Sequence, residues 1–172
     1  MMLKTGRGGN KGYTMAEMMT VIAVIFIILA IMTLSTSGLV KNTNLKTTTN
    51  NIVSMLELTR HYALANGKNY YLVLNGTSKK YYIATDSTPN SGAVDVIEGK
   101  TQSVPAGIVY DSITFPSIGP GPEPTVTFNK SGSLDASGEI ILGVELDGEI
   151  VQIKKITIDV LTGKAYVSNK DE

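Results

Sequence analysis

A single carboxylate, Glu17, directly precedes a long segment that carries no charge. From Met18 to Val40 the chain has 23 residues without an acidic or basic side chain. An unpaired carboxylate at the mouth of such an apolar segment costs free energy, and an ordinary signal peptide or membrane anchor gains nothing from it. We therefore expect Glu17 to have a cationic partner whose identity bears on function.

The uncharged segment is long enough to cross a membrane. As a helix it would span about 34 Å at roughly 1.5 Å per residue, compared with about 30 Å for the hydrocarbon core of a bilayer. Lys4, Arg7 and Lys11 precede it, and basic residues favour the cytoplasmic side. We predict a transmembrane and assembly helix over residues 13–40, with most of the chain outside the cytoplasm.

Three interpretations of this segment compete. A secretory signal peptide would be cut near the sequence STSG at 35–38, and a plain signal anchor would leave Glu17 without a partner. Cleavage after Gly12 instead makes Tyr13 the new N-terminus, whose α-amino group is a cation one helical turn before Glu17. In a bundle of such helices Glu17 can also meet the amine of a neighbouring chain, which would fix the axial register between subunits.

The third interpretation agrees with a known motif. Residues 11–31, KGYTMAEMMTVIAVIFIILAI, resemble the class III signal of type IV prepilins and type II secretion pseudopilins. In that family a basic leader ends in Gly, an aromatic residue follows, and Glu stands at the fifth mature position. The resemblance implies that a prepilin peptidase removes the basic leader, residues 1–12, and methylates the amine of Tyr13, which stands where the family usually has Phe.

The helix is expected to continue beyond the membrane. Ile52, Leu56, Thr59 and Ala63 recur at helical spacing, and Gly67 is a typical C-cap, so we predict one helix from Met15 to Asn66. Its part over 41–67 is an amphipathic continuation whose apolar stripe packs under a β-sheet. The Thr- and Asn-rich stretch 41–51 has poor helix propensity, so we expect bending or fraying there.

Residues 68–172 are predicted to form a β-rich globular domain. Short apolar runs separated by Gly, Pro and Asn-Gly turns indicate a largely antiparallel sheet, beginning with a hairpin around the turn at 75–78. The expected fold class is therefore α+β and pilin-like. In the run 149–160 the apolar side chains change parity at Lys154-Lys155, which predicts a bulge or a change of sheet there.

The second half adds a more specific resemblance. The order VPAGIVYDSITF, VTFNKSGSLDASGEIIL and ITIDVLTGKAYV is similar to the C-terminal domain of GspH/FimT-type minor pseudopilins. This implies a structural subunit of a type II secretion pseudopilus or type IV pilus in the bacterial inner membrane. The implied partners are other pilin or pseudopilin subunits, the prepilin peptidase, the inner-membrane assembly platform and membrane lipid.

The alternative function is a minor pilin that binds DNA for uptake in natural transformation. At the place of the family's basic motif this chain has only one basic residue, Lys164, although Lys154 and Lys155 on a neighbouring predicted strand are able to join it. Without residues 1–12 the chain has 12 basic and 15 acidic side chains, a net charge of −3. That balance argues against a general nucleic-acid binder.

Signatures of an enzyme or a metal site are weak. The lone His61 follows Glu57 by one helical turn, but no third ligand is evident, so we interpret the two side chains as a solvated pair. The segment 86–98 offers oxygen ligands for Ca²⁺ without the spacing of a defined calcium loop: Asp86, Asn90, Asp95 and Glu98. The chain contains no cysteine. We expect a protein that is not an enzyme and holds no cofactor.

Overall fold

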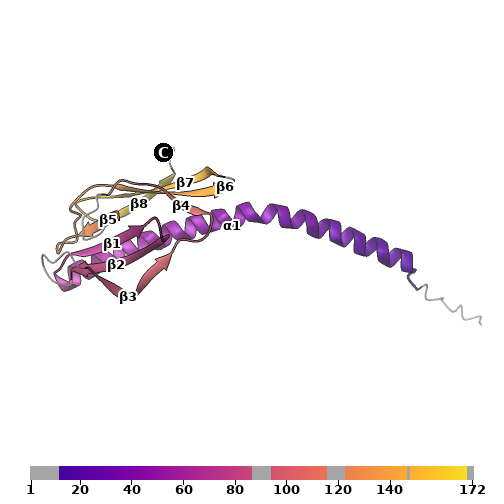
Figure 1. The fold of residues 1–172 in the computed structure, drawn as a ribbon, viewed down its shortest axis with the longest axis horizontal. Helices are drawn as coiled ribbons and strands as arrows, with labels where there is room; N and C mark the ends of the chain where they lie inside the picture. The colour runs from indigo at the N-terminus through magenta and orange to yellow at the C-terminus, as the bar shows by residue number, and fades with distance from the viewer. Residues whose placement is uncertain (1–11, 87–93, 116–122, 147, 170–172) are drawn as a thin grey trace, which may run out of the picture. The chain divides into compact units, whose positions relative to one another are not determined.

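The computed structural model describes residues 12–86, 94–115, 123–146 and 148–169, apart from the side chains at 32–37, 39, 86, 94 and 98. The chain divides into two compact units, Met1–Leu39 and Val40–Glu172. Its elements are, in order, α1 (Met15–Asn66), β1 (Tyr70–Asn75), β2 (Lys80–Asp86), β3 (Val94–Ser103), β4 (Ile108–Ile113), β5 (Thr125–Phe128), β6 (Glu139–Leu146), β7 (Glu149–Ile158) and β8 (Ala165–Asn169) (Figure 1).

The helix α1 has the predicted bounds, Met15 and Asn66. It ends because Gly67 adopts a positive φ of 61° and donates its N–H to the carbonyl of Ala63 at 3.0 Å. The expected fraying over 41–51 is wrong, since this stretch is helical throughout. Its buried side chains, Leu45, Thr48 and Thr49, are each at most 2% exposed, so tertiary packing overrides their weak intrinsic propensity.

The β-strands form two antiparallel sheets of four strands, in the orders β3-β2-β1-β5 and β4-β6-β7-β8. All the strand pairs are antiparallel. The hairpin between β1 and β2 closes at the pair Asn75 and Lys80, where the sequence predicted a turn. Within the unit Val40–Glu172, α1 runs alongside both sheets (Figure 1). The predicted α+β, pilin-like class is confirmed.

One hydrophobic core joins the helix to both sheets. The predicted stripe of Ile52, Leu56, Thr59 and Ala63 is fully buried at 0% exposure, which confirms the packing role of this face. It meets side chains of the first sheet, such as Leu72, and of the second sheet, such as Leu142, in a single cluster. Every buried member of that cluster lies between Leu45 and Ile158, so the core among the described residues belongs to the second unit.

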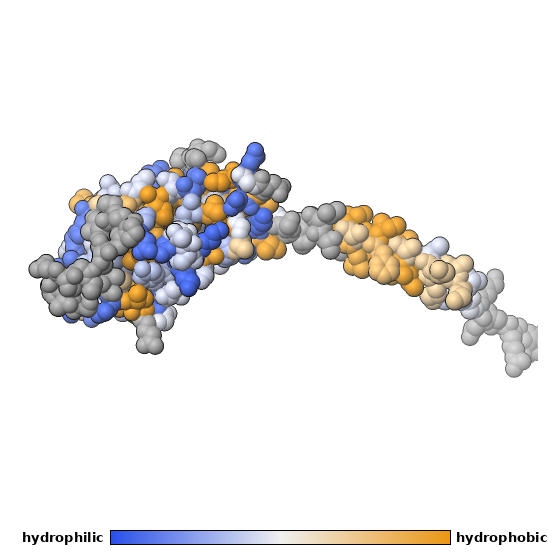
Figure 2. All heavy atoms as spheres, viewed as in Figure 1, coloured by the Kyte–Doolittle hydropathy of each residue, from blue (hydrophilic) through white to orange (hydrophobic). Residues whose placement is uncertain are grey.

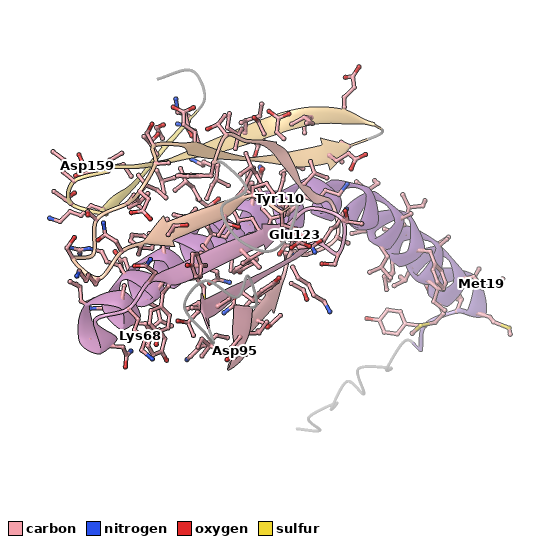
Figure 3. All side chains as sticks on the ribbon, turned by 60° about the vertical axis from the view of Figure 1, so that its left-hand side comes forward. Met19, Lys68, Asp95, Tyr110, Glu123 and Asp159 are labelled. Carbon is pink, nitrogen blue, oxygen red and sulfur yellow. The ribbon has the colours of Figure 1, made fainter. Side chains whose placement is uncertain are left out.

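Tyr110 on β4 brings a polar group into this core (Figure 3). Its hydroxyl is buried without a hydrogen-bond partner among the described residues. Burial, together with the nearby Tyr81 hydroxyl, raises the pKa of Tyr110 far above the ordinary value for tyrosine. Tyr110 therefore acts as an apolar core residue and stays protonated at physiological pH.

Two features of the sheets differ from the sequence prediction. The strand β3 was not predicted, because Asp95, Glu98, Gly99 and Lys100 interrupt its β-branched side chains and are uncommon in strands. The irregularity of β7 lies at Val151, where the register with β6 shifts between Gln152 and Ile150, while Ile153 to Thr157 pair without interruption. The bulge predicted at Lys154-Lys155 is thus wrong in position. The prediction counted Val151 among the apolar residues that alternate toward the core, but Val151 faces outward and is 51% exposed.

Candidate assembly site

Glu17 closes the first turn of α1. Its Oε2 atom accepts the backbone N–H of Thr14 at 2.8 Å and the Thr14 hydroxyl at 3.0 Å. In return, the Thr14 hydroxyl oxygen accepts the N–H of Glu17 at 3.2 Å. This reciprocal arrangement is a capping box, which satisfies backbone donors that a helix start otherwise leaves open. Glu17 in the single chain thus contacts a neutral neighbour in its own turn.

Gly12 and Tyr13, the residues of the predicted cleavage site, lie just before the helix. Neither has helical structure, and Tyr13 is 80% exposed. Among the described residues, no atom other than those of its chain neighbours lies within 4 Å of the position that a Cβ on Gly12 would take.

The described turns of α1 after Glu17 expose apolar side chains, and Figure 2 shows those on one face in orange. Phe26 is 67% exposed and Ile27 is 61% exposed. A contiguous apolar surface of this kind marks a place where a membrane or another protein binds. Among the residues whose side chains are described, no helix has a stretch long and apolar enough to span a membrane. The predicted run Met18–Val40 includes side chains at 32–37 and 39 that lie outside the described residues.

The three lysines of the predicted DNA-contact patch do not form one cluster. Lys154 donates its Nζ to Asn169 Oδ1 at 2.5 Å, and the Nζ of Lys155 lies 2.7 Å from Glu139 Oε1. Lys164 lies at the other end of the β7 and β8 pair, where its carbonyl accepts the N–H of Asp159. Asp159 is five residues beyond Lys154, a separation of about 17 Å along a strand.

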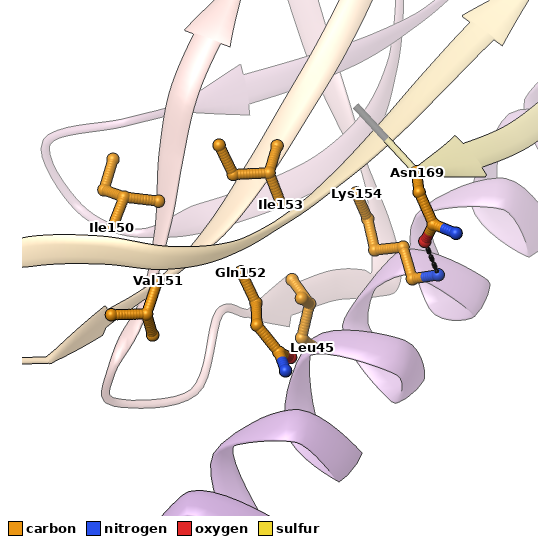
Figure 4. A pocket seen from close by; sticks show the side chains of 7 residues that line it. All are labelled: Leu45, Ile150, Val151, Gln152, Ile153, Lys154 and Asn169. Carbon is orange, nitrogen blue, oxygen red and sulfur yellow. Dashed lines mark hydrogen bonds between the residues drawn. The ribbon is translucent and has the colours of Figure 1, made fainter. Parts of the chain in front are cut away.

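A groove of about 440 Å³ runs along β7, lined by Leu45, Ile150, Val151, Gln152, Ile153, Lys154 and Asn169 (Figure 4). Ile150 and Ile153 project to one side of the strand, while Gln152 projects toward Leu45 of α1. Over Glu149–Ile153 the strand pairs with β6, and no described residue of β8 pairs with it there. This groove, which has both apolar and polar lining residues, is a surface that the sequence did not indicate.

A second groove of about 310 Å³ surrounds Lys164, lined by Glu57, Arg60, His61, Gly163, Lys164, Ala165 and Tyr166. It brings together one helical turn of α1 and the start of β8, segments that lie about a hundred residues apart in the sequence. Sequence reasoning placed Lys164 with Lys154 and Lys155 and treated His61 with Glu57 alone. The grouping depends on how the turn between β7 and β8 docks on the helix, for which the local sequence carries no signal.

The candidate metal ligands give no ligand set in the described part of the chain. Within it, no three His, Cys, Asp or Glu side chains are close enough to hold one ion. Of the predicted calcium ligands, Asn90 and the side chains of Asp86 and Glu98 lie outside the described residues.

Comparison with known proteins identifies the fold. No protein-family model and no curated protein matches the sequence. A structure of the minor pseudopilin EpsH from the type 2 secretion system of Vibrio cholerae matches with a TM-score of 0.58 at 11% identity, covering 75% of this chain and 99% of that chain. A crystal structure of the minor pseudopilin EpsH from the same system matches with a TM-score of 0.53 at 13% identity, covering 74% and 94%. The chain shares the fold of these minor pseudopilin structures, which confirms the resemblance at the level of fold.

Proposed function

We propose that this chain is a minor pseudopilin, a structural and non-enzymatic subunit that joins a type II secretion pseudopilus through its N-terminal helix. The proposal rests on one coincidence: the chain that matches the EpsH structure over 75% of its length also carries Lys11, Gly12, Tyr13 and Glu17 before an uncharged run. The two features support the proposal separately, because the described members of the core cluster all lie at or after Leu45.

In this role the chain is inserted in the bacterial inner membrane with its N-terminus in the cytoplasm. The uncharged run holds it there, and prepilin peptidase cuts between Gly12 and Tyr13 and methylates the new amine. The exposure of Tyr13 and the absence of helical structure at Gly12 support this step, because a peptidase needs backbone that is free of helical hydrogen bonds. Membrane lipid, the assembly platform and neighbouring subunits are then its partners.

During assembly the Glu17 carboxylate pairs with the terminal amine of a neighbouring subunit. The described bonds from Thr14 both go to Oε2, and the carboxylate is exposed in the single chain. A methylated terminal amine of a neighbouring helix can therefore approach it without breaking the capping box. In a packed, low-dielectric bundle this charge pair disfavours any other axial offset, because a shifted register would leave the carboxylate unpaired.

DNA uptake is the alternative role, and the structure offers it little support. Two of its three lysines are engaged, Lys154 with Asn169 and Lys155 with Glu139. Residues 42–172 carry 11 basic and 14 acidic side chains, so long-range attraction to DNA is poor. We expect an electrophoretic shift titration near physiological salt to show only weak binding of duplex DNA. Micromolar binding that disappears in a Lys154/Lys155/Lys164 triple alanine variant would favour uptake instead.

Purification from the native membrane tests the proposal directly. The full chain, tagged at its C-terminus, is cross-linked in its own host, extracted with detergent and analysed by mass spectrometry. We expect other subunits with a basic leader and Glu at the fifth mature position, together with assembly-platform proteins of a secretion system. Recovery without any such subunit, or only with components of a DNA-uptake machine, would contradict the proposal.

A further inference from the structure

The groove around Lys164 is built by an unusually close contact between three segments. A Cβ placed on Gly163 would lie 2.5 Å from the carbonyl oxygen of Gly132 and 2.9 Å from Cδ of Arg60. Gly163 is buried and has a positive φ of 65°, which a residue with a side chain adopts only under strain. The turn between β7 and β8 is therefore pressed against α1 and against the loop that contains Gly132.

This contact brings Arg60 and the turn that carries Lys164 to the same groove. Arg60 is half-buried, and its Nε donates to the carbonyl of Gly132 at 3.1 Å, which holds the guanidinium in one orientation. The turn that carries Lys164 is held by Asp159, whose Oδ1 accepts the N–H and the hydroxyl of Thr162 at 2.7 and 2.8 Å. The Arg60 guanidinium and the backbone at Lys164 are thus held in place before any ligand arrives, and such preorganisation lowers the entropic cost of binding.

The groove has an excess of positive charge in an acidic unit. Arg60 and Lys164 line it against one acid, Glu57, and neither forms a salt bridge within the described residues. His61 and Tyr166 complete its wall, and Tyr166 is 59% exposed. An arginine and a lysine that line one groove, with an imidazole and a phenol as further donors, suit an oxyanion.

We propose that this groove binds a carboxylate presented by an acidic segment of a partner protein. A volume of about 310 Å³ holds one or two side chains rather than a long polymer. The surrounding unit has more acidic than basic side chains, so the repeated phosphates of a nucleic acid meet net repulsion away from the groove, whereas a single carboxylate does not. The groove residues belong to the second unit, whereas Gly12 and Glu17 belong to the first. A failure of this inference can therefore be distinguished from a failure of the proposed pseudopilus role.

The only histidine of the chain gives a direct probe. The full chain in detergent micelles produces one set of imidazole signals in a ¹H–¹³C NMR spectrum, and those signals come from His61 inside the groove. The chain is titrated with a capped hexaglutamate peptide, with capped hexalysine, with inorganic phosphate and with a short DNA duplex. We expect a saturable shift of the His61 signals with hexaglutamate and none with hexalysine.

Two variants and a matched control test the geometry. Removing one charge-assisted contact in Lys164→Ala should weaken hexaglutamate binding on the order of tenfold. Arg60→Lys keeps the charge but loses the planar donor fixed by Gly132, so it should also weaken binding. Lys80→Ala removes an exposed lysine on β2, which does not line the groove, and should change the affinity less than twofold.

Three results would overturn the inference. One is no shift of the His61 signals with hexaglutamate, and another is an equal loss of affinity in Lys164→Ala and Lys80→Ala. The third is binding of the DNA duplex or of phosphate that is tighter than binding of hexaglutamate and is lost in Lys164→Ala, which would assign the groove to a phosphate ligand. Thermal unfolding of each variant confirms that the exposed substitutions leave the fold intact.

Discussion

The Oε2 atom of Glu17 lies 2.8 Å from the backbone nitrogen of Thr14 and accepts its N–H. The bond gives the carboxylate a local role as the closing residue of a capping box. It also distinguishes the observed task of Glu17, starting the helix, from its proposed task, carrying a charge for a neighbouring subunit. Substitutions that remove one task and retain the other can distinguish them.

Glu17→Gln should keep the helix start but prevent assembly. Glutamine serves at the third position of a capping box as glutamate does, but it has no charge to pair with a terminal amine. We expect the variant to remain in the membrane and to be absent from sheared or cross-linked fibres. Glu17→Val removes both the cap and the charge and should fail in the same assay. Recovery of the Gln variant in fibres at the native level would show that the charge is dispensable.

The mature chain should begin at Tyr13. Cleavage between Gly12 and Tyr13 removes the basic leader, residues 1–12, and methylation adds a CH₂ to the new amine. Intact-mass and N-terminal peptide analysis of protein from its own host measures both changes. An N-terminus near residue 38 would instead identify an ordinary signal peptide.

Leu56→Ala should destabilise the second unit strongly. Leu56 is 0% exposed at the centre of the core, and truncating such a side chain typically costs about 2–5 kcal/mol. Leu64→Ala is the matched control on the same helix, because Leu64 is 45% exposed and should lose well under half as much. Urea unfolding of residues 40–172 measures the difference. Equal costs would mean that the stripe does not carry the core.

Gly163→Ala should cost more stability than Gly148→Ala. Both glycines have a positive φ, 65° and 85°, so both substitutions strain the backbone. Only Gly163 has a neighbour in the way, since nothing lies within 4 Å of the Cβ position at Gly148. We expect an extra loss of about 1–3 kcal/mol at Gly163 from the displaced turn. The comparison uses thermal or urea unfolding, and similar losses would show that the contact with Gly132 is easily relaxed.

Asp159 should contribute to stability except at acid pH. Hydrogen bonds from the N–H and hydroxyl of Thr162 lower the pKa of Asp159. A carboxylate with a lowered pKa in the folded state stabilises the fold above its unfolded pKa of about 3.9, and this contribution is lost as the pH falls through the folded value. The unfolding free energy of Asp159→Asn should therefore depend less on pH between about 5 and 2 than that of the native chain. Parallel curves would exclude this role.

The helix was predictable because its signals are local. The spacing of Ile52, Leu56 and Ala63 gave the buried face, and Gly67 gave the end. The helical conformation of 41–51 was not predictable from propensity, because it depends on burial of Leu45, Thr48 and Thr49 against residues far along the chain. The strand β3 failed for the same reason, since its pairing with β2 rather than its composition makes it a strand.

The candidate sites also differ in whether they depend on local sequence or on tertiary contacts. Gly12, Tyr13 and Glu17 form a motif within one short stretch, so the sequence is sufficient to predict it. The groove of Arg60, His61 and Lys164 depends on a turn that docks on a helix. A motif search compares neighbours in sequence and cannot detect such a group.

The location of the core has a consequence for how this chain tolerates change. Among the described residues, every buried member of the core cluster lies at or after Leu45, so we expect substitutions at the described positions before Val40 to change the unfolding free energy of the second unit little. In the proposed role, membrane insertion depends on the first unit and foldability on the second, so selection for the two would act on separate sets of positions. A chimera that joins this β-domain to the first forty residues of a different subunit should fold as the native chain does, while its place of incorporation follows the donor of the N-terminal segment.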